Sequence, residues 1–183
     1  GGAERVTWQF HQMFPDAPIF TSQYDPANFS WFDGADIRAT WLQALPSGAK
    51  KLLPPLRALA FRQLDVSEYD LVLTSSGAES KAVKRRPDAL QITYCHSPSR
   101  YYWANYDTYL ESPGLGRLDP LARFGLRTLI GPMRGLDRRA AQGADVLVAN
   151  STYIQREIET HYRRPSELVF PPVDVDRFAE HAR

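Results

Sequence analysis

The chain has 183 residues, enough for one sizeable hydrophobic core, and its 22 lysines and arginines nearly balance its 21 acidic residues. This balance gives no indication of a nucleic-acid partner. The single cysteine excludes an intramolecular disulfide and fits a reducing compartment. No segment has the roughly 18 consecutive apolar residues of a membrane span. We also see no export leader, so we expect a cytoplasmic protein.

Two adjacent glycines, Gly1 and Gly2, open the first predicted helix. Val6 and Phe10 are four residues apart, as in the apolar stripe of a helix, and Pro15 ends this pattern. Glycines at a helix start leave backbone N–H groups uncovered at the positive end of the helix dipole, where a phosphate can bind. The pair is therefore a candidate phosphate-binding turn, although a plain turn or a cloning remnant would look the same.

Short apolar segments alternate with helical patterns along the rest of the chain. Strands are predicted at residues 17–21, 69–74, 90–95, 144–149 and 168–173, and helices at residues 51–64, 78–85, 119–142 and 152–162. Residues 36–45 fit a strand followed by a turn, without a clear periodicity. Gly131-Pro132 predicts either a kink in the long helix or two short helices.

Such alternation is typical of βαβ units, so we predict an α/β fold with a Rossmann-like, doubly wound and mostly parallel sheet. A sheet of this kind normally begins with a strand that leads into the first glycine turn. We therefore also expect one strand ahead of Gly1, and we interpret the chain as a piece of a larger protein.

The densest basic cluster of the chain consists of four residues, Lys81, Lys84, Arg85 and Arg86. Such runs are usually the solvated face of a helix, and otherwise they contact anionic lipid or phosphate. Further basic groups would add to a membrane contact if all shared one face; they are Lys50-Lys51 and Arg134 with Arg138-Arg139. A peripheral contact with an anionic membrane is therefore one hypothesis for this chain.

The stretch 90–103 (LQITYCHSPSRYYW) carries the candidate chemistry. Apolar and polar residues alternate from Leu90 to Cys95, as in a strand, and Pro98 cannot continue the ladder. His96 is therefore expected on a loop just past the carboxyl end of a strand, the edge at which open α/β sheets bind ligands.

Several stretches, in this order, resemble the amino-terminal domain of family 4 retaining glycosyltransferases. They are residues 1–6, 69–72, 94–103 and 149–151, followed by 170–174 with Phe178. The specific part is the His-x-Pro-x-Arg-Tyr segment that begins at His96. The resemblance extends over nearly the whole chain and is strongest to bacterial mannosyltransferases of O-antigen and exopolysaccharide assembly.

The resemblance implies the GT-B architecture, in which two Rossmann-like domains face each other across a cleft. Residues 1–174 would form the acceptor-side domain and residues 175–183 the start of a linker. The domain that holds the nucleotide sugar, with its Glu-x7-Glu motif and diphosphate-binding residues, would be absent. This piece alone is therefore expected to be inactive.

The same resemblance assigns the site residues. His96 would be catalytic and reach the transferred sugar, with one imidazole nitrogen on a sugar hydroxyl and the other fixed by a backbone carbonyl. Gly1 and Gly2 would lie near the donor phosphates. The acceptor would contact Ser97, Arg100, Tyr101 and Trp103. The alternatives are an ion pair for Arg100 and core or interface packing for the rings, including Tyr102.

The implied reaction transfers a hexose, mannose from GDP-mannose, with retention to a lipid-linked or oligosaccharide acceptor in lipopolysaccharide or other cell-surface polysaccharide synthesis. In this family the leaving phosphate is thought to help deprotonate the acceptor hydroxyl. We expect neither a cofactor nor a metal, because the four histidines are scattered along the chain. Such an enzyme would be peripheral at the inner face of the cell membrane.

Two other classes of function were weighed. A non-catalytic module could hold a phosphorylated or lipid-linked glycan at the same sheet edge without any chemistry. A Rossmann oxidoreductase is disfavoured, because the sequence lacks Gly-x-Gly-x-x-Gly after a predicted strand.

Overall fold

The computed structural model of the chain describes residues 2–45, 53–76, 79–114 and 116–173. Three of the sequence predictions lie outside these residues, namely Gly1, Lys50-Lys51 and the linker at 175–183. No helix in the described part of the chain is long and apolar enough to cross a bilayer.

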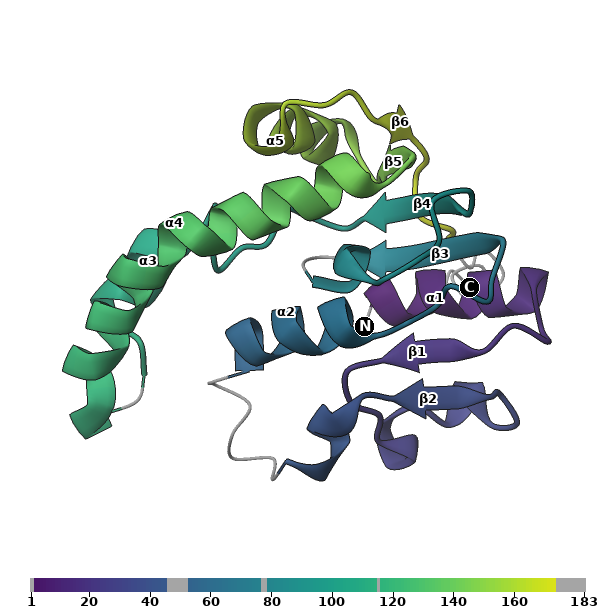
Figure 1. Cartoon of the computed structure of the whole chain (residues 1–183), viewed down its shortest axis with the longest axis horizontal. Helices are drawn as coiled ribbons and strands as arrows, with labels where there is room; N and C mark the ends of the chain where they lie inside the picture. The colour runs from purple at the N-terminus through teal and green to yellow at the C-terminus, as the bar shows by residue number, and fades with distance from the viewer. Residues whose placement is uncertain (1, 46–52, 77–78, 115, 174–183) are drawn as a thin grey trace, which may run out of the picture.

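The chain forms two sheets, one with strand order β3-β4-β5-β6 and one with order β1-β2 (Figure 1). The strands are β1 Ile19–Thr21, β2 Ile37–Ala39, β3 Leu71–Ser76, β4 Leu90–Cys95, β5 Val146–Ala149 and β6 Glu167–Leu168. The helices are α1 Gly2–Met13, α2 Leu53–Gln63, α3 Tyr106–Glu111, α4 Asp119–Gly143 and α5 Thr152–Tyr162. Short 3-10 turns are η1 Pro26–Asn28, η2 Ser30–Phe32, η3 Trp41–Ala44, η5 Glu79–Ala82 and η6 Gly116–Leu118. All pairings between these strands are parallel, which confirms the predicted Rossmann-like α/β fold.

The larger sheet is covered on both faces because its central strands alternate their side chains between two cores. On one face Ile92 and Tyr94 of β4 pack with Val6 and Phe10 of α1. On the other face Cys95 packs in a cluster that α4 and α5 supply, with Ala141, Ile154, Ile158 and Tyr162. The sheet is therefore doubly wound, and the apolar stripe predicted for the first helix is the surface that α1 buries.

The two sheets face a common cavity of about 590 Å³. Ile19 to Thr21 of β1 and Leu71 to Ser75 of β3 line it, together with residues of α1 and α2 such as Phe10 and Phe61. Among the described residues, no strand pairs with the outer edge of β1 or of β3. The strand expected ahead of Gly1 stays a prediction.

Most predicted elements are present with shifted ends. Residues 36–45 form β2 followed by η3, and the long helix is a single element of 25 residues that continues through Pro132. Ser151 caps α5 because its hydroxyl accepts a hydrogen bond from the Ile154 amide at 3.2 Å. The helix predicted at 78–85 is wrong. Within the described part of that range, the only helical element is the single 3-10 turn η5.

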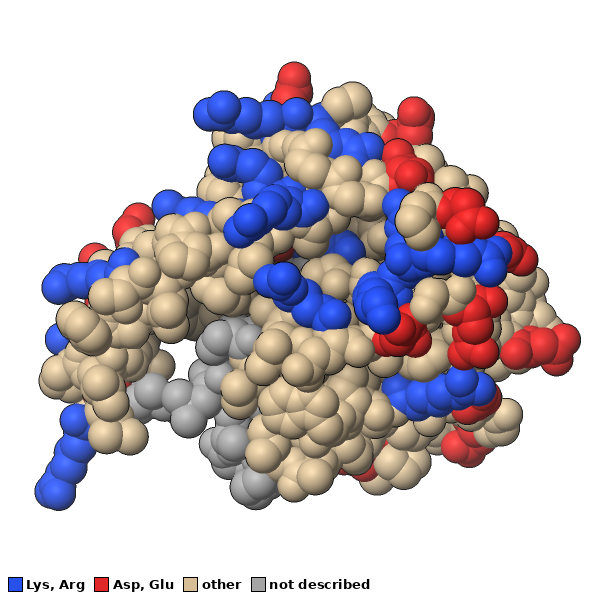
Figure 2. Space-filling view, viewed as in Figure 1, with Lys and Arg blue, Asp and Glu red and all other residues tan. Residues whose placement is uncertain are grey.

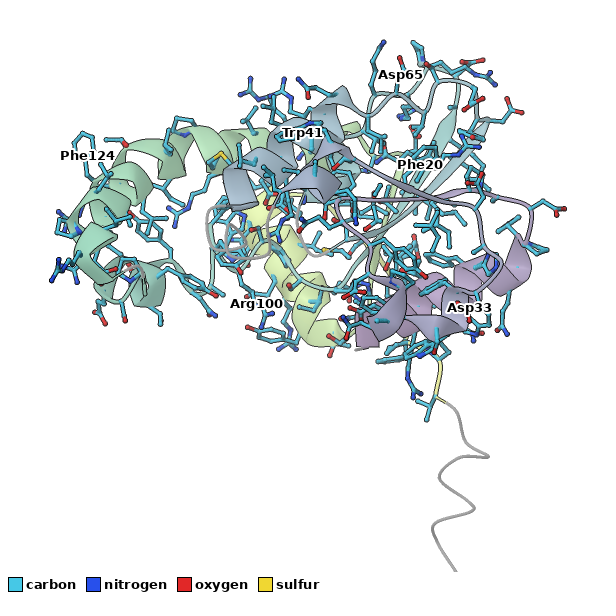
Figure 3. All side chains as sticks on the ribbon, turned by 90° about the horizontal axis from the view of Figure 1, so that it is seen from below. Phe20, Asp33, Trp41, Asp65, Arg100 and Phe124 are labelled. Atoms are coloured by element: carbon cyan, nitrogen blue, oxygen red, sulfur yellow. The ribbon has the colours of Figure 1, made fainter. Side chains whose placement is uncertain are left out.

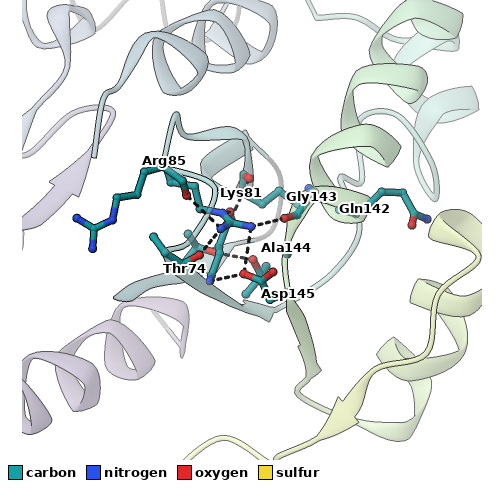
Figure 4. Close-up of polar contacts among 12 residues, drawn as sticks. Thr74, Lys81, Arg85, Gln142, Gly143, Ala144 and Asp145 are labelled. Atoms are coloured by element: carbon teal, nitrogen blue, oxygen red, sulfur yellow. Dashed lines mark hydrogen bonds and ion pairs between the residues drawn. The ribbon is translucent and has the colours of Figure 1, made fainter. Parts of the chain in front are cut away.

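The basic cluster of Lys81, Lys84, Arg85 and Arg86 is not a free cationic face, because its charges have acidic partners within the fold. Lys84 pairs with Asp65 at 2.6 Å and Arg86 with Asp70. Arg85 reaches from this segment to the α4–β5 connection, where it pairs with Asp145 at 3.1 Å and donates to the Gly143 carbonyl at 3.0 Å (Figure 4). The cluster therefore crosslinks segments of the domain, and we no longer assign it to membrane contact.

Lys81, the first member of the cluster, is buried. Its Nζ lies 2.5 Å from Oδ1 of Asp137 on α4, and both side chains are almost fully inaccessible. The other oxygen of Asp137 accepts hydrogen bonds from Trp103 Nε1 at 2.8 Å and from the Tyr162 hydroxyl at 2.9 Å. A buried ion pair is tolerated where its remaining hydrogen-bonding groups are satisfied in this way.

Replacing Asp137 with alanine should lower the free energy of unfolding by about 3–5 kcal/mol, because the Lys81 ammonium would stay buried without its carboxylate. The matched control is Asp65→Ala, which removes the partner of the exposed Lys84 and should cost much less, since solvent screens that pair. Urea-induced unfolding followed by circular dichroism measures both. Equal losses in the two variants would contradict the assignment of Lys81–Asp137 as the buried pair that stabilises the fold.

Candidate functional site

The candidate site lies at the carboxyl ends of β3, β4 and β5. The parallel register places Ser75 beside Tyr94, and the His96 amide donates to the Ser76 carbonyl at 2.9 Å. From the end of β5, Asn150 donates its side-chain amide to the His96 carbonyl at 3.2 Å. His96 therefore begins the loop after β4, as predicted, and two neighbouring strands hold its backbone.

The imidazole of His96 is oriented by a hydroxyl group. Its Nε2 lies 2.7 Å from Ser75 Oγ, and the Tyr94 ring packs edge-on against it with centroids 5.3 Å apart. From the sequence we expected a backbone carbonyl to fix one ring nitrogen. The structure shows a side-chain hydroxyl at Nε2 instead, because the parallel pairing of β3 and β4 brings Ser75 to the imidazole.

Burial lowers the pKa of His96 below its ordinary value, because desolvation disfavours the imidazolium. The negative charge of Glu4, in the first turn of α1, acts in the opposite direction but is the smaller effect. The ring is therefore neutral at physiological pH and has one N–H donor and one acceptor nitrogen to offer.

The amino terminus of α1 lies beside this pair of side chains. Gly2 is the first residue of the helix, and Ser75 Oγ is 3.5 Å from the Ala3 carbonyl oxygen. A Cβ atom at Gly2 would meet nothing within 4 Å, so the space beside the helix start is open. The structure thus brings together Gly2 and His96, two of the predicted site residues, at one edge of the sheet.

The next predicted residues lie farther along the loop. Ser97 is half-buried, whereas Arg100 and Tyr101 are exposed. No carboxylate in the described part of the chain forms an ion pair with Arg100. The Tyr101 ring packs on Tyr109 of α3 with centroids 4.6 Å apart, which leaves its outer surface accessible.

Trp103 and Tyr102 point into the protein. The Trp103 ring stacks on His161 with centroids 4.6 Å apart, and the Arg134 guanidinium lies 5.1 Å from its centroid. The Tyr102 hydroxyl is buried and donates to Glu79 Oε1 at 3.3 Å. Both rings pack between the loop and the helices, the alternative that the sequence left open, so we do not retain Trp103 as an acceptor-binding residue.

Sequence reasoning missed Ser75 and Asn150. A signal was present, because Ser75 and Asn150 directly follow the strands predicted at 69–74 and 144–149, and parallel strands end at the same edge of a sheet. In the described part of the chain, no group of three or more His, Cys, Asp or Glu side chains is placed to hold a metal ion.

The fold and this edge define a Rossmann-like α/β domain with a ligand site at the carboxyl ends of its strands. A family model described as "Glycosyltransferase Family 4" matches residues 1–177. The chain therefore belongs to glycosyltransferase family 4, and its chemistry is glycosyl transfer between a nucleotide-sugar donor and an acceptor. Neither a curated protein nor a solved structure matches the chain.

His96 should make the stability of the domain depend on pH. Because its pKa is lower in the folded state, the unfolded chain binds more protons below about pH 6.5, so stability falls as the pH falls through the folded-state pKa. Above about pH 6.5 the contribution of His96 to the free energy of unfolding no longer changes with pH. In His96→Gln this part of the acid destabilisation should disappear, as measured by urea unfolding at a series of pH values between about 5 and 8. Parallel pH dependences for the two proteins would contradict the lowered pKa.

Ser75→Ala should change the tautomer balance of the His96 imidazole, since Nε2 would lose its partner. The ¹⁵N chemical shifts of the ring nitrogens report this balance. His161, whose Nε2 contacts Glu157 at 3.3 Å, serves as an internal reference and should not change. Unaltered His96 shifts would show that Ser75 does not orient the ring.

Proposed function

We propose that this chain is the acceptor-side half of a retaining hexosyltransferase of GT-B architecture. In this proposal a second domain holds the nucleotide sugar, and the transferred hexose is mannose from GDP-mannose. The acceptor is a lipid-linked or oligosaccharide glycan of cell-surface polysaccharide synthesis, and the enzyme works peripherally at the cytoplasmic face of the membrane. Family membership supports the transfer, and the resemblance of the His96 segment supports the finer assignment.

The observation that carries the proposal is the position of the Ser75–His96 pair beside the amino terminus of α1. A helix start provides backbone N–H donors for a phosphate, and a neutral imidazole provides a hydrogen bond for a sugar hydroxyl. A sugar phosphate needs both kinds of group within one site. The open space beside Gly2 leaves room for the phosphate at the helix start.

In the proposed reaction the acceptor hydroxyl oxygen forms a bond to the anomeric carbon, and the bond from that carbon to the donor phosphate breaks on the same face. The proton of the hydroxyl goes to the leaving phosphate. His96 does not take this proton. With its Nε2 on Ser75, the imidazole holds the transferred sugar and stabilises the charge that develops there.

Arg100 is the proposed anionic contact for the acceptor. It is exposed on the same loop as His96, and a guanidinium can bind a diphosphate through two parallel hydrogen bonds. Tyr101 offers an exposed ring beside it for stacking on a sugar. Ser97, the residue after His96 on this loop, stays in the proposal as an acceptor-binding hydroxyl.

Saturation-transfer NMR tests the assignment with a short-chain lipid-diphosphate sugar and, separately, with GDP-mannose. The chain should bind the lipid-diphosphate sugar, and GDP-mannose should bind weakly or not at all. Arg100→Ala should weaken acceptor binding about tenfold or more, because a hydrogen bond to a charged group contributes roughly 1.5–3 kcal/mol. For His96→Ala we expect acceptor binding to change less than about twofold, because in this proposal the imidazole contacts the transferred sugar and not the acceptor.

The matched control is Arg62→Ala, which removes an exposed arginine in the last turn of α2 and should leave acceptor binding unchanged. Tight binding of GDP-mannose by this chain would mean that the two halves are misassigned. A loss of acceptor binding in His96→Ala as large as that in Arg100→Ala would favour a module in which His96 holds the glycan itself without catalysis. Binding of neither ligand would contradict an acceptor site in this domain.

A further inference from the structure

The first half of α4, together with α3, forms an arm that projects from the domain. Figure 1 shows this part of α4 beyond the sheets, with α3 against it, and Figure 3 labels Phe124 near its far end. The buried residues of α4 are Asp137 and Ala141, both in its second half, and α3 has none. The first half of α4 therefore does not belong to the core of the domain.

One face of this arm is apolar and exposed. Leu121 and Phe124 are 68% and 66% accessible, and Leu118 and Leu129 are exposed as well. At 100° per residue Leu121, Phe124 and Leu129 lie within one sector of α4, together with the uncharged Gly125, Thr128 and Pro132. Leu118 directly precedes the helix as its N-cap residue. We call Leu118, Leu121, Phe124 and Leu129 the apolar face of the arm.

Two exposed arginines, Arg117 and Arg127, lie beside this apolar face. Residues 117–131 contain Arg117, Arg123 and Arg127 but only one acid, Asp119. Arg117 and Arg127 are exposed, and Figure 2 shows basic side chains at the tip and along the edge of the arm with uncharged residues between them.

The short helix α3, which carries the acids Asp107 and Glu111, packs on the side of α4 opposite to Leu121. Arg123 donates to the Leu110 and Glu111 carbonyls at 3.1 and 2.8 Å, so α3 packs on the side of α4 that carries Arg123. Leu121 is two residues from Arg123 and therefore points to the opposite side of the helix.

We propose that the apolar face of the arm docks on an anionic lipid bilayer, with α4 lying in the interface. Leucine and phenylalanine on one side with arginines at the border is the pattern of an interfacial amphipathic helix. The basic border favours an anionic bilayer over a second copy of the chain, because two such arms would bring like charges together. This inference deepens the proposed function, on whose peripheral membrane location it rests, because it names the surface that contacts the bilayer.

The location of the docking face differs from the membrane patches that the sequence suggested. Lys81 and Arg85 are used inside the domain, and Arg134 and Arg138 donate to the Tyr102 and His161 carbonyls at 2.6 and 2.9 Å. The arm instead combines exposed apolar area with arginines whose charges face solvent.

Co-sedimentation with vesicles tests the proposal. The chain should bind phosphatidylcholine vesicles that contain phosphatidylglycerol and bind pure phosphatidylcholine much more weakly. Phe124→Ser should weaken binding about tenfold, because one aromatic side chain no longer enters the bilayer, and Leu121→Ser in addition should weaken it further. Arg127→Gln should weaken binding to the anionic vesicles and reduce its dependence on salt.

The matched control is Phe170→Ser, since Phe170 is 64% accessible, nearly as much as Phe124, but lies after β6 and not on the arm. Equal losses for Phe124→Ser and Phe170→Ser, or no vesicle binding by the unmodified chain, would overturn the proposal. Sedimentation velocity tests the alternative that a second copy of the chain binds this face. If the unmodified chain forms a dimer that Phe124→Ser dissociates, and it does not bind vesicles, the apolar face is a contact between two copies. The vesicles contain no glycan and the acceptor assay contains no bilayer, so either proposal can fail without the other.

Discussion

The carboxylate of Asp137 is the group on which the packing behind the larger sheet depends. It pairs with Lys81 and accepts hydrogen bonds from Trp103 and Tyr162, so it joins η5, the loop after β4, α4 and α5. Such a charge is stable away from water only while all of these partners are present. Because Trp103 lies in the loop that begins at His96, the same carboxylate anchors the loop of the candidate site.

The opposite end of that loop is held by the sheet. Parallel pairing puts the last residues of β3 beside those of β4, which brings Ser75 to His96, and α1 places its amino terminus next to both. Burial keeps the imidazole neutral while its backbone is fixed by Ser76 and Asn150. A neutral, oriented imidazole at a helix start suits the recognition of a sugar phosphate in a glycosyltransferase of family 4.

Predictions from local patterns succeeded where the cause is local. Alternation in β4 followed by Pro98 placed His96 at the end of a strand, and the helical pattern at 152–162 predicted α5. The basic run that begins at Lys81 was misinterpreted, because its partners Asp137 and Asp145 lie more than 50 residues away in the sequence. Trp103 is a similar case, since nothing next to it indicates that His161 and Asp137 would occupy its ring and its N–H group.

The sequence by itself determined the fold class and the position of His96 just past the carboxyl end of β4, the edge of the candidate site. Short-range sterics set strand ends and helix starts, and parallel strands necessarily end at a common edge. Only the tertiary structure decided that Ser75 orients His96, that Trp103 belongs to the core and that the apolar side of the first half of α4 is left exposed. These outcomes depend on which distant segments pack against each residue, and a one-dimensional pattern does not contain that information.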